Sequence, residues 1–97
     1  MSLDAQSRSG DAEQRGGRLG LPLWALVIHS VDYAGITYVE TCLINTVRTL
    51  SLERAAEISY EAHTHGRARV VTCPLEVAEF YRERLESLVL RASIERA

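Results

Sequence analysis

The sequence predicts an α+β fold: a single small domain in which a three-stranded antiparallel sheet packs against three helices. The first observation is size. Residues 1–20 hold four of the six glycines and no aromatic or β-branched side chain, which leaves 77 of the 97 residues to fold around one core layer. The second is the order of the segments, because strand-like and helix-like patterns follow one another as β-α-α-β-α-β. Three strands with short connections favour a small sheet backed by helices over a doubly wound sheet.

Residues 1–20 are predicted to form a disordered N-terminal tail. The segment carries three arginines against two aspartates and one glutamate, and it has almost no apolar side chain to bury. Too little apolar surface is available to offset the entropy lost on ordering the chain. The sequence therefore divides into a tail, residues 1–20, and a folded domain, residues 21–97.

The first strand is predicted over Leu23–His29, LWALVIH, which is short and rich in residues that suit a buried pleated surface. Asp32 and Gly35 then mark a turn. Beyond the turn, apolar residues recur at steps of three and four, which predicts an amphipathic helix with Cys42 on its buried side. The recurring residues are Ile36, Val39, Leu43, Val47 and Leu50.

The second helix has recognisable signals at both ends. Ser51 can accept a backbone N–H as an N-cap, and Glu53 lies in the first turn, where the helix dipole favours an anion. Gly66 suits a left-handed C-cap. A second strand, RARVVT, follows at residues 67–72.

The third helix is predicted to begin around Pro74, because proline is tolerated in the first helical turn. Its apolar residues share one side, while glutamates and arginines occupy the face toward water. These apolar residues are Val77, Tyr81, Leu85 and Leu88. After Ser87, the segment LVLRASI has the composition of a strand.

Composition and charge exclude several classes of function. All eleven basic residues are arginine, so the chain lacks the lysine of a phosphate-binding loop or of a Schiff base. A net charge of −2 argues against nucleic acid as a binding partner, because binding to phosphates requires a basic surface. The longest apolar run, Leu21–Ile28, is too short to span a bilayer and does not resemble a secretion signal. Cys42 and Cys73 form no C-x-x-C pair, so we expect neither a disulfide nor a metal site and place the protein in the reducing cytoplasm. We also expect no cofactor and no membrane partner.

Catalysis is not expected at the end of the first strand. His29, Ser30 and Asp32 are the residue types of a hydrolase triad. Adjacent strand residues, however, point to opposite faces of a sheet, so their side chains cannot form one.

His63 and His65 are weak candidates for metal ligands. They lie two residues apart near a helix end, about 200° apart around the axis, so they cannot chelate one ion as an i, i+4 pair does. A lone histidine there more often bonds a carbonyl at the helix end. A small enzyme or metal protein built on these histidines and Cys73 is therefore the least favoured alternative.

Several motifs, in order and spacing, resemble the ClpS family of adaptors for the AAA+ Clp protease. His63-Thr-His-Gly-Arg-Ala is followed by Pro74-Leu-Glu-Val-Ala-Glu, as a histidine, glycine, basic residue and short strand precede a helix in that family. The family has a strand ending in N-D-D-Y at the position of Val27–Tyr33, which reads VIHSVDY here. It has the motif M-E-F-V at the position of Ile36–Val39. Leu90–Ala97 resembles the closing strand. The likeness extends over residues 21–97 and implies the same β-α-α-β-α-β fold.

The resemblance implies an adaptor without catalytic activity. It would bind proteins that bear a bulky apolar N-terminal residue and present them to a Clp AAA+ ATPase of the ClpA or ClpC type. In the family an asparagine, an aspartate and a histidine hold the free α-amino group, and these positions become Ser30, Val31 and His63. Valine offers no side-chain acceptor to an ammonium, and the loss of a hydrogen bond to a charged group costs roughly 1.5–3 kcal/mol. Asp32 matches a second family aspartate and replaces the missing acceptor only if the backbone bulges.

The resemblance also implies an apolar pocket for the N-terminal side chain. Its wall carries over to Ala34, Ile36, Val39, Ser59 and Ala62. Ile36 and Ser59 stand at family methionines, so the small Ser59 widens the pocket while the branched Ile36 stiffens its mouth. Ordinary packing between the first two helices is the competing interpretation of these residues.

Two further features carry over from the family. Glu76 corresponds to a glutamate that faces the ATPase, and residues 1–20 correspond to a flexible extension used in delivery. The alternative function is a regulatory protein that binds the Clp ATPase but has lost recognition of N-terminal residues. The substitutions at Ser30 and Val31 favour that alternative.

Overall fold

The computed structural model describes residues 21–30 and 33–97, and it has the predicted element order. A strand, β1 (Trp24–His29), precedes two helices, α2 (Ile36–Thr46) and α3 (Leu52–His65). A second strand, β2 (Arg67–Cys73), is followed by α4 (Leu75–Ser87) and the last strand, β3 (Arg91–Arg96). The predicted disordered tail, residues 1–20, lies outside the described residues.

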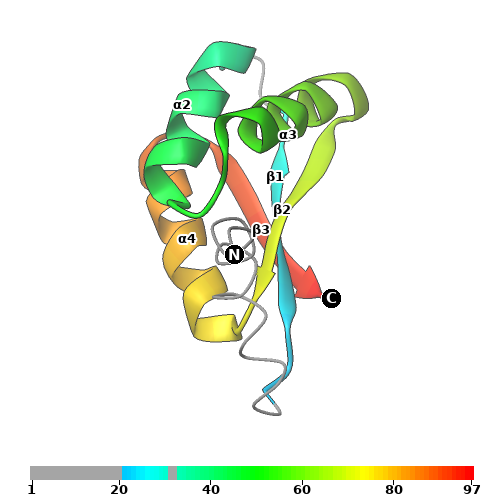
Figure 1. Ribbon diagram of the computed structural model, residues 1–97, viewed down its shortest axis with the longest axis vertical. Coiled ribbons are helices and arrows are strands. Elements are labelled where there is room, and N and C mark those ends of the chain that lie inside the picture. The colour runs from blue at the N-terminus through cyan, green and yellow to red at the C-terminus, as the bar shows by residue number, and fades with distance from the viewer. Residues whose placement is uncertain (1–20, 31–32) are drawn as a thin grey trace, which may run out of the picture.

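The sheet has three strands in the order β2-β1-β3, and both pairings are antiparallel, which confirms the predicted α+β class. Because β1 is central, its residues Ala25–Ile28 are buried almost completely. The pairing of β1 with β2 shifts by one residue between Leu26 and Val27. Figure 1 shows α4 running alongside the strands, whereas α3 crosses them near the end of β1.

The core lies between the sheet and the helices. Leu26 and Ile28 of β1 pack with apolar residues of all three helices, and Cys42 is buried as predicted. Most of these residues fall on the helical and strand periodicities of the sequence. The core members from the helices and their connections are Cys42, Leu43, Val47, Ala55, Ile58, Ala62, Leu85 and Leu90.

β1 begins and β2 ends one residue later than the sequence predicted, and three other element boundaries also differ. The periodicity that suggested helix as far as Leu50 overran α2, which ends at Thr46. A turn follows in which Leu50 N–H donates to Val47 O at 3.0 Å, although Val47 is fully buried and Leu50 packs on the core. Pro74 is not within the first turn of α4 but is its N-cap residue, where its carbonyl accepts from Val77 and Ala78.

The last strand also begins later than its composition suggested. β3 starts at Arg91, and the preceding residues 88–90 form a turn in which Val89 has a positive φ of 68°. A β-branched residue rarely adopts that conformation. Hydrogen bonds from the hydroxyls of Tyr33 and Tyr38 to the backbone of this turn hold it in place.

Candidate functional site

A cleft of about 320 Å³, including its part open to solvent, lies where the end of β1 meets α2, α3 and the turn before β3. Six of its lining residues are apolar and four are polar. They are Ile28, His29, Ser30, Ala34, Ile36, Val39, Ser59, Ala62, His63 and Leu90.

The cleft brings together seven of the nine residues that the sequence assigned to a peptide site. These seven are Ser30, Ala34, Ile36, Val39, Ser59, Ala62 and His63. Val31 and Asp32 lie outside the described residues. Glu76 lies elsewhere, exposed in the first turn of α4.

Three lining residues were missed by the sequence analysis: Ile28, His29 and Leu90. Ile28 and His29 are the last two residues of β1 and come directly before Ser30, so extending the predicted site backward along the strand would have found them. Leu90 carries no comparable signal. It lies 27 residues beyond His63 in sequence, and only the return of the chain after α4 brings it to the cleft.

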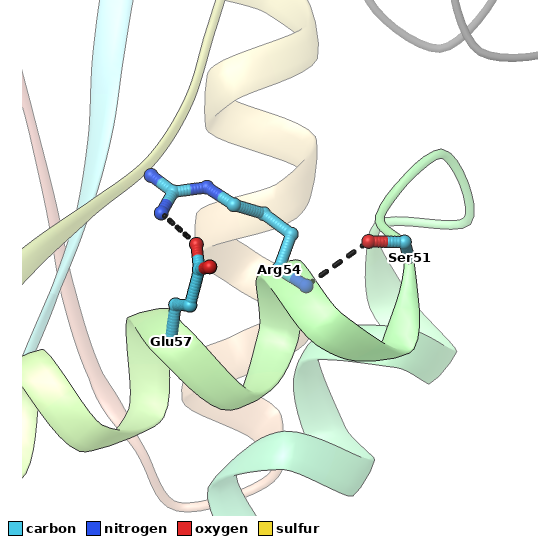
Figure 2. A network of polar contacts seen from close by, with 3 residues as sticks. All are labelled: Ser51, Arg54 and Glu57. Atoms are coloured by element: carbon cyan, nitrogen blue, oxygen red, sulfur yellow. Dashed lines mark hydrogen bonds and ion pairs between the residues drawn. The ribbon is translucent and has the colours of Figure 1, made fainter.

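Helix α3 supplies one wall of the cleft. Ser59, Ala62 and His63 are spaced i, i+3, i+4 and therefore share one helix face. The helix begins as predicted, because the Ser51 hydroxyl accepts the Arg54 backbone N–H at 3.0 Å. Arg54 also pairs with Glu57 at 3.1 Å on the exposed surface (Figure 2), a contact of the weak i, i+3 type.

The end of α3 is tied to the end of β1. Gly66 closes the helix in the left-handed conformation, with φ 91°, and its N–H donates to Ala62 O at 2.9 Å. Its carbonyl accepts the Ser30 N–H at 2.9 Å. These two backbone bonds hold Ser30 beside the last turn of α3, so that Ser30 and His63, both exposed, border the same cleft.

The turn before β3 supplies a further part of the wall. Leu90 N–H donates to Leu85 O at 3.1 Å. Two tyrosines close the turn, because the Tyr33 hydroxyl donates to Val89 O at 2.8 Å and the Tyr38 hydroxyl donates to Leu88 O at 2.7 Å. The side-chain hydrogen bond with Cys42, more than burial, raises the pKa of Tyr38 above its ordinary value. The wall that carries Leu90 is therefore fastened to the start of α2.

The polar residues at the cleft and the cysteine of β2 lie apart from one another or have other partners. His29 Nε2 lies 2.8 Å from Ser93 Oγ of β3, so its imidazole already has a hydrogen-bond partner. Within residues 21–30 and 33–97, no three His, Cys, Asp or Glu side chains gather as metal ligands. Cys73 is buried at the far end of β2, about 20 Å along the strand from the end that follows His65.

The cleft is best suited to an apolar side chain with a polar end. Its walls are mainly aliphatic, from Ile28, Val39 and Leu90 among others. Ser59 is 2% exposed, and its hydroxyl has no hydrogen-bond partner among the residues that the structure describes. Ser30 and His63 add hydrogen-bonding groups at the exposed border.

None of the described helices combines the length and the apolar character that crossing a membrane requires. This finding concerns residues 21–30 and 33–97 alone.

Comparison with known proteins identifies the family. The family model described as "ATP-dependent Clp protease adaptor protein ClpS" matches residues 21–93. An adapter protein ClpS of Synechococcus elongatus is 42% identical over 74 residues, which cover 76% of this chain and 78% of that protein. The ClpS of Gloeobacter violaceus is 36% identical over 78 residues, covering 80% of this chain and 84% of that protein.

A solved structure shares the fold. ClpS2 of Agrobacterium tumefaciens, bound to L-phenylalaninamide, superposes with a TM-score of 0.72 over 78% of this chain and 98% of that one, at 23% identity. The chain described here belongs to the ClpS family of ATP-dependent Clp protease adaptors.

Proposed function

We infer that this adaptor binds the N-terminal residue of other proteins in the cleft and presents those proteins to a Clp AAA+ ATPase of the ClpA or ClpC type. The observation that carries the inference is the composition of the cleft. Seven residues at the family's binding positions line it together, with aliphatic walls within and Ser30 and His63 at the border. An apolar side chain would enter the cleft, and the α-amino group would stay at the border.

The comparison structure supports the chemical class of the ligand. L-phenylalaninamide, which Agrobacterium tumefaciens ClpS2 holds, has a free α-amino group and a benzyl side chain. The cleft offers each part a matching environment, because Ser30 and neutral His63 can accept hydrogen bonds and the walls bury apolar surface.

Recognition is proposed to be altered, because two of the three family acceptors are replaced. Ser30 retains one hydroxyl acceptor, whereas the Val31 side chain has none. His63 is then the principal remaining side chain for the ammonium. Its removal should cost the binding free energy of a charge-assisted hydrogen bond, roughly 1.5–3 kcal/mol, or about 10- to 150-fold in affinity.

The test is fluorescence anisotropy with labelled peptides that begin with Phe, Tyr, Trp, Leu or Ile, each with an N-acetylated control. Free-amine peptides are expected to bind at least about tenfold better than the acetylated ones. His63→Ala should lose most of this difference, and His65→Ala is the matched control, since His65 is exposed on the same helix end but does not line the cleft. Equal binding of free and acetylated peptides would contradict the proposed recognition.

Docking on the ATPase is proposed to involve Glu76, which is exposed on α4 away from the cleft lining. Glu76→Arg should weaken capture by the Clp ATPase while peptide affinity stays unchanged. Residues 1–20 are proposed as a delivery arm that acts in the cytoplasm. Their deletion should slow degradation of a bound substrate without affecting peptide binding.

The second candidate is a regulatory protein that occupies the Clp ATPase and has lost peptide recognition. The absence of an acceptor in the Val31 side chain favours it. The same pair of assays separates the candidates. Capture of the ATPase without any preference for free-amine peptides would support the regulatory function and exclude the adaptor function proposed above.

A further inference from the structure

Ser59 is an anomaly in the wall of the cleft. The residue is 2% exposed, and within residues 21–30 and 33–97 its hydroxyl has no hydrogen-bond partner. Buried polar groups in proteins are almost always paired, and leaving one unpaired destabilises the fold. A ligand group that enters the cleft deeply enough to reach this buried hydroxyl would supply the partner that it lacks among the described residues.

Three other helical hydroxyls are paired within their own helix. Thr41 and Thr64 donate to carbonyls four residues earlier, Thr37 O at 3.0 Å and Tyr60 O at 2.7 Å. Ser87 donates to Arg84 O at 2.7 Å. Ser59 is a helical residue of the same type, but its hydroxyl does not make this bond.

The surroundings of Ser59 define what can reach it. The nearby wall residues Ile36, Val39 and Ala62 are aliphatic, so a polar group must arrive at the end of an apolar side chain. Ser59 lies one helical turn before His63, about 6 Å along the α3 axis. If the α-amino group stays near His63, a side chain long enough to cover this distance places its end beside Ser59.

We propose that Ser59 makes the cleft select tyrosine over phenylalanine at the N-terminus of the bound protein, through a hydrogen bond between the Ser59 hydroxyl and the phenolic hydroxyl. This inference rests on the proposed function and specifies its substrate class. Tyrosine has an apolar ring for the aliphatic walls and a terminal hydroxyl that both donates and accepts. Phenylalanine has the same ring and leaves Ser59 unpaired.

The experiment compares two peptides that differ only in an N-terminal Tyr or Phe, titrated against the full chain and two variants. The native protein should bind the Tyr peptide about 2- to 10-fold more tightly, the ratio expected for one neutral hydrogen bond. Ser59→Ala should bring the ratio to about one by weakening the Tyr peptide alone. Ser87→Ala is the matched control, because it removes a helical serine hydroxyl that does not line the cleft and should keep the preference.

The outcomes separate this inference from the proposed function. Phe and Tyr peptides that bind equally, and better than acetylated controls, would overturn the role of Ser59 and leave N-terminal recognition standing. A Tyr preference that persists in Ser59→Ala would also overturn it. Failure of both peptides to bind would overturn the inference together with the proposed function. A thermal melt of each variant verifies that the protein remains folded.

Discussion

Gly66 offers a sharp test of how the cleft is assembled. Its φ of 91° is strained for any residue with a Cβ, yet a Cβ added there would meet no atom within 4 Å. The cost of Gly66→Ala is therefore conformational rather than steric, about 1–2 kcal/mol in the free energy of unfolding. For a domain of this size, that corresponds to a fall in Tm of about 4–16 °C.

Urea denaturation followed by the fluorescence of Trp24, the single tryptophan, measures this loss. Gly35→Ala is the matched control, because Gly35 has an extended backbone with φ −78° and equally open surroundings. In Gly35→Ala, alanine is a poorer N-cap residue than glycine, but it also makes the unfolded chain less flexible. These two effects nearly cancel, so the free energy of unfolding should change by less than about 0.5 kcal/mol. If Gly66→Ala proved no more destabilising than Gly35→Ala, the left-handed corner could not be what fixes the end of α3.

Three further outcomes are expected. Ser59→Ala should raise the free energy of unfolding by about 1 kcal/mol in a urea titration, because it removes an unpaired buried hydroxyl; a loss of stability would contradict this. Val89→Asn should raise it by about 0.5–1 kcal/mol, since Asn tolerates the left-handed region better and the 60% exposed Val89 side chain contributes little packing; an unchanged Tm would contradict it. The pKa of Tyr38 is raised in the folded state, so its contribution to stability is complete below its ordinary value of 10.0 and is lost as the pH rises through the folded pKa. Stability measured between pH 9 and 12 should therefore fall less steeply for Tyr38→Phe than for the native chain.

Local signals explain which parts of the fold were predictable. The boundaries of α3 were predicted closely, because the Ser51 hydroxyl and the conformational freedom of Gly66 act within a few residues of themselves. The start of β3 was not, because Val89 and Leu90 have strand composition but are held in a turn by hydroxyls from Tyr33 and Tyr38. Contacts between residues fifty positions apart leave no trace in a local pattern.

The same distinction applies to the cleft. Periodicity alone would assign Val39 and Ala62 to ordinary helix packing, and only their alignment with a family pattern marked them as pocket residues. Leu90 was aligned with the family's closing strand and not with its pocket, because its place at the cleft depends on the path of the chain after α4. That the Ser59 hydroxyl lacks a partner among the described residues is likewise invisible in sequence, since a serine in a helix usually bonds to its own backbone.

The central position of β1 has a consequence for how the protein is made. β1 is complete at His29, but its second partner strand ends at Arg96, 67 residues later. At typical rates of synthesis this interval lasts roughly 3–13 s. Throughout it, an apolar segment without charge, Trp24–Ile28, has at least one open edge, which favours pairing with other nascent chains. Shielding of this segment by a chaperone during synthesis should therefore raise the yield of soluble protein.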